Sequence, residues 1–408
     1  MQELKQTNGV TPRQCEGSST SACDASGGLC QRAWVEIDQA ALAHNVRQLK
    51  KLLASKTQLM AVVKADAYGH GATMVARTAL DAGAGGLCVA TVQEGIQLRE
   101  AGIEAPILLL GATNTPEQVR AIAYWQLQPT ICTPQQALVF SETLSGLKKT
   151  LSVHLKLDTG MSRLGMPWQE ARQFVELVKR LPYLEMKSVY SHLATADSLD
   201  PTVMTVMRLQ HQRFEEAIAQ LHSAGIEPPC LHLANSAATL TDPALHYDLV
   251  RVGLALYGLY PAEHLRGAID LKPVMQVKAR VTQVKTIPPG TGVSYGYQFI
   301  AERQMRLAVI GIGYADGIPR NLSNKMTVII RGKRVRQIGA ITMDQLMLDV
   351  SEIPDLQTGE VVTLIGQDGD LSISADDWAQ SLGTISWEIL CSFKHRLPRV
   401  AVSKGVLA

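Results

Sequence analysis

The sequence predicts an α/β protein in which a (β/α)8 barrel of the TIM type is followed by a mainly β C-terminal domain. Between residues 31 and 270, eight short apolar runs alternate with amphipathic helical patterns, which is the number of units in a closed barrel. Beyond Pro273 the pattern changes to period-two strands separated by turns. The 408 residues also exceed what one hydrophobic core usually serves. We expect a disordered tail over 1–30, the barrel over 31–270 and the second domain over 271–408.

The barrel strands are predicted from runs rich in Val, Ile and Leu, each followed by a helical pattern. Such apolar strands are typical of parallel sheets that helices cover on both faces. A doubly wound open sheet is the alternative. Ahead of these runs, a strand near 33–37 is expected to join the β domain, and Asp38 can cap the helix that follows it. The predicted barrel strands are 59–63, 87–92, 107–110, 127–131, 151–157, 186–190, 230–233 and 249–256.

The second domain is predicted from alternating strands that follow one another without long helices. The basic segment Arg331-Gly332-Lys333-Arg334 places a glycine between two strands, which favours a hairpin turn over a site for polyanions. Helical patterns return only over 375–382 and around Trp387. The predicted strands of this domain are 277–281, 305–312, 326–330, 334–341 and 360–364.

Charge, hydropathy and cysteine usage exclude several classes of protein. A net charge of +2 is too small for a binder of nucleic acid backbones, and no apolar run reaches the roughly 18 residues of a membrane span. Seven cysteines without a CxxC pair predict neither a disulfide framework nor a zinc ribbon, so we expect a cytoplasmic location. Three of them lie in the Ser/Gly/Thr-rich head over 1–30, where a regulatory thiol cluster is the alternative to a tail.

Two local motifs do not carry the chemistry that they suggest at first sight. The glycines at 311, 313 and 317 are spaced one residue too widely for a dinucleotide-binding loop, and they lie within the β domain. The segment 368–370 lacks the carboxylate spacing of a calcium loop, and the ten histidines form no HExxH pair. No metal site is predicted.

Lys64 is the first candidate for chemistry because it ends a predicted buried strand. Burial disfavours a charged amine, so a lysine at the mouth of a barrel is a candidate nucleophile that could hold pyridoxal phosphate as an imine. The next turn supplies the Tyr68 hydroxyl and flexible glycines that could meet a phosphate. The alternative is a lysine that reaches solvent from a strand end.

A second group of polar residues follows the strand that ends near Lys156. A glycine-rich turn there delivers Arg163, whose guanidinium suits a carboxylate, although a structural ion pair between Asp158 and Arg163 is an equal alternative. Polar residues recur at the ends of later strands, which is where barrels carry their active sites. These residues are His192, Asn235, Ser236, Arg251 and Gly253.

Residues 62–71 read Val-Val-Lys-Ala-Asp-Ala-Tyr-Gly-His-Gly, and this stretch resembles the cofactor attachment motif of the alanine racemase family. The resemblance runs from about residue 33 to the carboxyl end and leaves out the cysteine-containing head. It implies a pyridoxal 5'-phosphate enzyme with a barrel and a β domain. Its other motifs lie at 156–165, 191–197, 234–237, 251–254, 293–296, 313–317 and 342–345.

The resemblance implies two bases on opposite faces of the substrate Cα. Lys64 would hold the cofactor and serve one face, and Tyr295 from the β domain of a second subunit would serve the other, so a homodimer with shared active sites is expected. Arg163 would contact the cofactor and the substrate carboxylate, and Met343 of the partner would offer its backbone N–H to that carboxylate. Lys156 matches a lysine that is carbamylated in many family members.

Further positions match residues that bind the cofactor or support the site. Arg251 would face the pyridine nitrogen, with His192 in the same network, while Trp387 stands where the family usually has a tyrosine. We expect its larger ring to keep the pocket small and selective for alanine. The phosphate-binding positions are Tyr68, Ser236, Gly253 and Leu254, and the supporting positions are Asn235, Tyr314, Arg320 and Asp344.

The expected reaction is the interconversion of L-alanine and D-alanine, which would supply D-alanine for cell-wall peptidoglycan. A racemase with a broader range of amino acids, or one for serine, is the main alternative, because one methylene or hydroxyl changes affinity by only about 1–3 kcal/mol. Arg251 and Tyr295 argue against a barrel-type pyridoxal-phosphate decarboxylase. The β domain argues against a single-barrel protein that only binds the cofactor.

Overall fold

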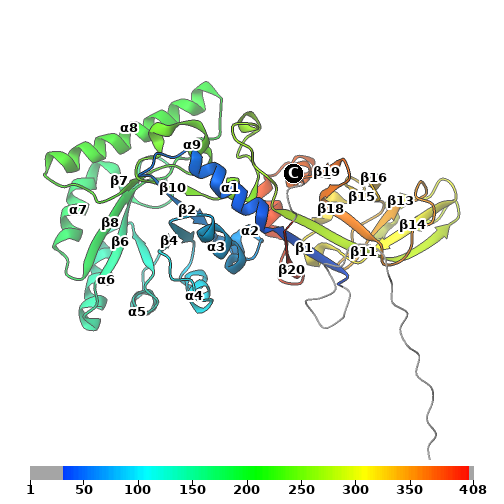
Figure 1. Ribbon diagram of the computed structural model, residues 1–408, viewed down its shortest axis with the longest axis horizontal. Coiled ribbons are helices and arrows are strands. Elements are labelled where there is room, and N and C mark those ends of the chain that lie inside the picture. Colours follow the sequence, from blue (N-terminus) through cyan, green and yellow to red (C-terminus); the bar gives the residue numbers. More distant parts are fainter. Residues whose placement is uncertain (1–30, 404–408) are drawn as a thin grey trace, which may run out of the picture.

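The computed structural model describes residues 31–403, and the predicted head and the last five residues lie outside this range. Eight parallel strands form a nearly closed barrel, and a second sheet of mainly antiparallel strands forms the C-terminal part (Figure 1). The predicted fold class is therefore confirmed, and every apolar run assigned to the barrel contains a strand. These strands are β2 (Gln58–Val62), β3 (Gly86–Val89), β4 (Ile107–Ala112), β5 (Gln128–Ile131), β6 (Leu151–Asp158), β8 (Leu184–Tyr190), β9 (Leu231–His232) and β10 (Leu249–Val252).

The barrel is nearly closed where β10 meets both ends of the strand order. This strand pairs in parallel with β2, and Arg251 N–H donates to the carbonyl of Ala234 at 3.0 Å, just beyond β9. The alternative of an open doubly wound sheet is therefore wrong. The helices of this part are α1 (Gln39–Lys51), α2 (Lys64–Tyr68), α3 (Ala72–Asp81), α4 (Val92–Glu100), α5 (Pro116–Tyr124), α6 (Pro134–Leu147), α7 (Ala171–Arg180), α8 (Pro201–Ser223) and α9 (Ser236–Thr241).

Local sequence signals explain where several helices begin. Asp38 caps α1 by accepting the N–H of Ala41 at 3.0 Å, as predicted. Thr115 and Thr133 each cap a helix whose next residue is proline, which needs no backbone donor at that position. The helix starts that follow β4 and β5 are therefore set by two or three adjacent residues.

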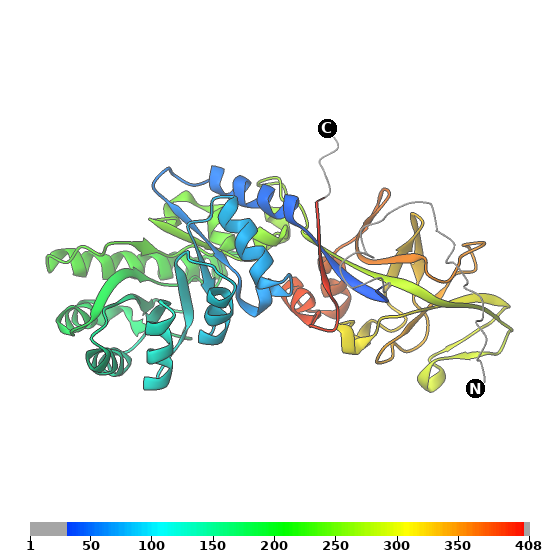
Figure 2. The ribbon, with the colours of Figure 1, turned by 60° about the horizontal axis from the view of Figure 1, so that its bottom comes forward.

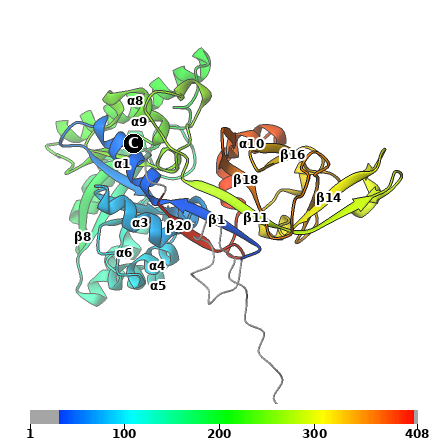
Figure 3. The ribbon, with the colours of Figure 1, turned by 45° about the vertical axis from the view of Figure 1, so that its right-hand side comes forward.

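The β domain is built around β11 (Met275–Ile287), a 13-residue strand that pairs with three others. One of them is β1 (Ala33–Asp38), which also pairs in parallel with β20 (Arg399–Val402), so segments from the two ends of the described chain lie side by side (Figure 3). The remaining strands are β7 (Met166–Pro167), which extends the barrel sheet, and β12 (Gly292–Val293), β13 (Phe299–Ile300), β14 (Met305–Ile310), β15 (Thr327–Ile330), β16 (Lys333–Arg336), β17 (Leu346–Asp349), β18 (Val361–Asp368) and β19 (Leu371–Ile373).

The late helices and the predicted hairpin are present. Strands β15 and β16 are joined by Arg331 and Gly332, both with positive φ, as a tight hairpin requires. Helices α10 (Ala375–Leu382) and α11 (Ser386–Ser392) lie between the barrel and the β sheet, in red in Figure 2. The carbonyl of Leu390 would lie 2.5 Å from a Cβ placed on Gly69, so α11 packs directly against the turn that follows α2.

Candidate active site

Lys64 begins a turn with unusual backbone geometry at the end of β2. The four residues that follow it, Ala65 to Tyr68, all have φ of 53° or 54°, which is the left-handed region. None of them is glycine, and each such residue costs roughly 1–2 kcal/mol. The turn therefore persists only because its surroundings hold it.

Three side chains hold this turn. The Glu94 carboxylate accepts the N–H of Ala65 at 2.7 Å with one oxygen, and its other oxygen accepts from the backbone at the start of α4. Asp66 accepts the N–H of Ala72 at 2.7 Å. The buried His70 donates from Nδ1 to the carbonyl of Ala67 at 2.9 Å, and burial lowers its pKa to about 4, so its ring is neutral.

Lys64 lines a cavity of about 730 Å³ at the carboxyl ends of the barrel strands. The described residues around it include four cationic side chains and one carboxylate, that of Asp197. Such an excess of positive charge in a concave site favours an anionic ligand. The predicted site residues that line this cavity are Lys64, Tyr68, Lys156, Arg163, His192, Asn235, Ser236, Arg251, Gly253, Leu254 and Trp387.

Arg251 is the most deeply buried of these cations, with 3% of its surface exposed. Its guanidinium donates to Nδ1 of His232 at 2.6 Å and lies 3.2 Å from Nδ1 of His192. It also donates to the carbonyls of Ser191 and Leu233 and stacks 5.0 Å from the ring of Tyr190. No carboxylate is among these partners within residues 31–403.

Lys156 also lies over the Tyr190 ring, with Nζ 5.5 Å from the ring centre. Burial, and then the charge of Arg251, lowers the pKa of this amine to about 8. The nearby Asp158 accepts the backbone N–H groups of Gly160 and Ser162. Within the described chain it forms no ion pair with Arg163, so that alternative is wrong and the exposed guanidinium is left to line the cavity.

A small cradle of hydroxyl and backbone N–H groups lies beside Lys64. Ser236 Oγ accepts the N–H of Gly253 at 2.9 Å, and the hydroxyl of Tyr68 would lie 2.6 Å from a Cβ placed on that glycine. Asn235 caps α9 through its side-chain oxygen and donates to the carbonyl of Leu193 at 3.3 Å. The close approach of Tyr68 explains why position 253 is glycine.

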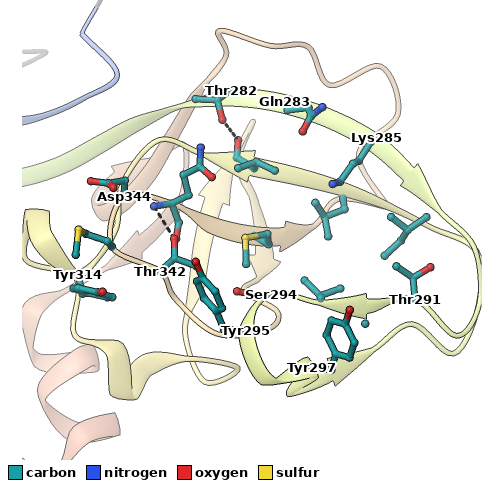
Figure 4. Close-up of a pocket in the computed structure, with 18 residues that line it drawn as sticks. Thr282, Gln283, Lys285, Thr291, Ser294, Tyr295, Tyr297, Tyr314, Thr342 and Asp344 are labelled. Atoms are coloured by element: carbon teal, nitrogen blue, oxygen red, sulfur yellow. Dashed lines mark hydrogen bonds between the residues drawn. The ribbon is translucent and has the colours of Figure 1, made fainter.

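Tyr295 lies elsewhere, in a second hollow of about 1260 Å³ on the β domain (Figure 4). Its side chain is 76% exposed, and it follows Ser294, whose φ is 64°. The Ser294 hydroxyl donates to the carbonyl of Ala340 at 2.7 Å, which anchors the turn that presents the phenol. Within one chain the structure therefore does not bring Tyr295 and Lys64 into one cavity.

The other predicted residues of the β domain share this second hollow. Met343 is 52% exposed, and Asp344 is anchored by Arg396 at 2.7 Å. The N–H of Tyr314 donates to the carbonyl of Thr342 at 2.9 Å, which ties the two loops together. Tyr314, Tyr295, Met343 and Asp344 thus form a second group, separate from the one around Lys64. Arg320 lies outside both groups, in a smaller hollow beside Gln298.

Sequence reasoning missed three residues that shape the site. Tyr190 was recognised only as a strand end, although both buried cations lie over its ring. His232 lies on the predicted strand 230–233 without a local motif, and Glu94 lies 30 residues beyond Lys64. The position of Tyr190, two residues before His192 at a strand end, was the one available signal.

In residues 31–403 no helix is both long and apolar enough to cross a membrane. Within the same range no three His, Cys, Asp or Glu side chains are grouped as metal ligands.

The fold and the site define a two-domain barrel enzyme with a lysine in an electropositive cavity. The family model described as "Alanine racemase, N-terminal domain" matches residues 37–261, and that of the C-terminal domain matches residues 274–401. The chain belongs to the alanine racemase family.

Individual relatives agree with this assignment over nearly the whole chain. The alanine racemase of Nostoc sp. is 68% identical over 94% of this chain and 100% of its own length. That of Synechocystis sp. is 65% identical over 91% of this chain and 99% of its own length. The crystal structure of alanine racemase from Bacillus anthracis with bound L-Ala-P superposes with a TM-score of 0.86 at 36% identity, covering 92% of this chain and 96% of that one.

Proposed function

We propose that this enzyme interconverts L-alanine and D-alanine with pyridoxal 5'-phosphate as its cofactor and with Lys64 and Tyr295 as its two bases. The names of its relatives support the reaction. The separation of the two residues supports a site shared between two copies of the chain, because Lys64 lines a cavity while Tyr295 is 76% exposed on another part of the same chain. An inverted stereocentre needs one proton removed from one face and one delivered to the other.

The cavity fits the proposed cofactor in charge, size and shape. Four cations against one carboxylate suit a phosphate, and about 730 Å³ lies within the range of cofactor sites. Gly253 leaves open a space that a Cβ would fill, beside the hydroxyls of Tyr68 and Ser236. We infer that these groups and the backbone of Leu254 hold the phosphate.

The chain's own residues would divide the work as follows. Bound pyridoxal phosphate makes the substrate Cα–H acidic by withdrawing electrons. Lys64 would hold the aldehyde through its amine and, once released, take or return a proton at Cα on its own face. Arg251 keeps its proton, so it would leave the pyridine nitrogen unprotonated and limit electron withdrawal. Arg163 would orient the substrate carboxylate.

A second copy of the chain would complete the site. Tyr295 of that copy would serve the opposite face of Cα, and Met343 would offer its N–H to the carboxylate. A phenol is a weak base at neutral pH, so we propose that His192 and Arg251 support it by hydrogen bonding. This arrangement requires a homodimer, in which the exposed Tyr295 would be covered.

Two further residues would tune the site. The lowered pKa of Lys156 makes its free amine available near neutral pH, which favours carbamylation, and the resulting negative charge would sit among the cations of the cavity. Trp387 lines the same cavity, and its indole would restrict the pocket to small side chains such as that of alanine. A racemase with a broader range remains the alternative to this specificity.

The biological role follows from the product. D-alanine is a building block of peptidoglycan, and we propose that the enzyme supplies it in the cytoplasm. The cysteine usage supports that location, since the described cysteines form no disulfide.

Hybrid dimers test the shared site most directly. Lys64→Ala should abolish the visible absorption of the bound cofactor, whereas Tyr295→Phe should keep it, and each variant alone should be nearly inactive. Mixing them under subunit exchange should restore about a quarter of the wild-type activity, because about half of the dimers are then mixed and each mixed dimer has one intact site. If mixing restored nothing while exchange was demonstrated, the shared site would be refuted. A protein that stays colourless after addition of pyridoxal phosphate would refute the cofactor.

A second measurement separates the reaction from its alternative. Loss of optical rotation from L-alanine without carbon dioxide release identifies a racemase, whereas carbon dioxide release identifies a decarboxylase. Exchange of the Cα proton for solvent deuterium should then be slowed by Tyr295→Phe far more on one enantiomer's face than on the other's. Equal slowing of this exchange for both enantiomers in deuterated water would contradict the assignment of separate faces.

A further inference from the structure

A continuous chain of polar side chains crosses the interior of the barrel. It begins at Gln128, the first residue of β5, and passes through His154 on β6 and Ser188 on β8. It then reaches His232 on β9 and ends at Arg251 on β10. The three middle residues are at most 3% exposed. The chain thus connects the amino end of the barrel with the guanidinium in the active-site cavity.

The contacts along this chain are short. Gln128 Oε1 lies 3.0 Å from Nε2 of His154, and Nδ1 of His154 lies 2.6 Å from Ser188 Oγ. Ser188 Oγ lies 2.8 Å from Nε2 of His232, and Nδ1 of His232 lies 2.6 Å from Arg251 Nη1. Each ring nitrogen of the two histidines therefore has one partner.

These contacts allow only one direction of proton donation. Arginine can only donate, so Nδ1 of His232 must accept, and its proton must lie on Nε2. Nε2 then donates to Ser188, which leaves the serine hydroxyl to donate to Nδ1 of His154. The proton of His154 therefore also lies on Nε2, from which it is donated to the side-chain oxygen Oε1 of Gln128.

Packing alone does not explain why polar side chains occupy this buried part of the barrel. The interior of an eight-stranded barrel is usually filled by branched apolar side chains. Polar groups in such a place are costly unless every one has a partner. This network satisfies both nitrogens of each histidine, which favours a role for it beyond filling space.

We propose that Gln128, His154 and Ser188 are positioning residues that fix His232 as the Nε2–H tautomer and thereby hold Arg251 in place. The inference rests on the role proposed above for Arg251. Without these three hydrogen-bonded side chains, His232 could carry its proton on Nδ1. That N–H would then face the N–H groups of the Arg251 guanidinium, and neither group could accept. Arg251 would then lose its 2.6 Å contact and move relative to a ligand in the cavity.

The surroundings of His154 keep it neutral. The charged or titratable groups that face it are Lys187, Arg251 and His232, and none is anionic. Burial, then the charge of Lys187, lowers its pKa to about 3. The tautomer chain is therefore stable across the ordinary range of pH.

Gln128→Glu is the sharpest perturbation, because it is isosteric and lies at the far end of the barrel from the cavity. A carboxylate at this position stabilises the doubly protonated ring and raises the pKa of His154. Once protonated on both nitrogens, His154 donates from Nδ1 to Ser188. Ser188 must then donate to Nε2 of His232, whose own proton moves to Nδ1, facing Arg251.

Gln58→Glu is the matched control. Gln58 is the exposed first residue of β2. Gln58→Glu therefore makes the same chemical change at the same end of the barrel, and it does not alter the row of polar side chains from Gln128 to Arg251. Both variants are compared with the wild type as cofactor-loaded protein, by the pH dependence of kcat and KM and by ¹⁵N NMR of histidine-labelled protein.

In the wild type we expect the His154 and His232 signals of two Nε2–H tautomers. In Gln128→Glu, kcat should fall by about tenfold on the acid side, the factor that one charge-assisted hydrogen bond supplies, while Gln58→Glu keeps the wild-type profile. A proton on Nδ1 of His232 in the wild type would overturn the proposal, and so would identical pH profiles for the two variants. Absence of a bound cofactor would refute the proposed function instead, and it would leave the tautomer assignments unchanged.

Discussion

Replacing Glu94 by Gln should impair the site because it loosens the backbone turn that carries Lys64. The four left-handed residues of that turn cost about 4–8 kcal/mol together at roughly 1–2 kcal/mol each. Glu94 contributes to holding them through the 2.7 Å contact with the N–H of Ala65. Its second oxygen accepts from Ala90 at 2.7 Å and Thr91 at 3.0 Å.

A glutamine at position 94 cannot accept hydrogen bonds both from Ala65 and from the backbone at the start of α4. Its single acceptor oxygen serves two N–H groups if it remains at the start of α4, so its NH2 group then faces Ala65. A hydrogen bond to a charged group is worth about 1.5–3 kcal/mol, and the lower figure applies here because the contact is partly open to solvent. About 1.5 kcal/mol corresponds to roughly tenfold in an equilibrium constant.

Thr91→Ala is the control because Thr91 forms the other half of the same helix cap. Its hydroxyl accepts the N–H of Glu94 at 3.3 Å, and its loss should cost about 1 kcal/mol of stability. Both variants should therefore lower the unfolding midpoint in urea. Only Glu94→Gln should also weaken cofactor binding, by about tenfold, measured by titration with pyridoxal phosphate. The reasoning is refuted if Thr91→Ala weakens cofactor binding as much as Glu94→Gln does.

Three further changes test other parts of the site. Gly253→Ala places a Cβ 2.6 Å from the hydroxyl of Tyr68, so phosphate-dependent binding of the cofactor should weaken while binding of pyridoxal without phosphate changes less, measured by titration with both. Because burial lowers the pKa of Lys156, the unfolded chain binds more protons than the folded one between about pH 8 and the ordinary lysine pKa, and this residue should make stability rise with pH there. Lys156→Met should remove that rise in urea unfolding of the cofactor-free protein in buffer kept free of carbon dioxide, where the amine is not carbamylated, and an unchanged slope would contradict the burial argument. Trp387→Tyr should increase turnover of serine relative to alanine, and a lower ratio would show that the indole does not restrict the pocket.

Local patterns in the sequence were sufficient for most of the fold. Asp38 and the alternating residues before it predicted the start of α1, and the glycine at 332 predicted the β15–β16 hairpin. Strands β17, β19 and β20, which are four, three and four residues long, were not predicted. Strands β17 and β20 pair with β14 and β1, which lie far away in the sequence, so a short sequence window does not contain their partners.

The candidate site, like the fold, was predictable from the sequence only in part. The sequence alone determined that Lys64 follows a buried strand and that polar residues recur at the ends of later strands, because these are properties of adjacent residues. Only the tertiary structure decided that Glu94 holds the turn of Lys64, that Ser188 and His154 lie behind His232, and that Tyr295 stands apart from the cavity. These contacts join residues from different strands and loops, and their distances depend on how the barrel closes and how the β sheet packs.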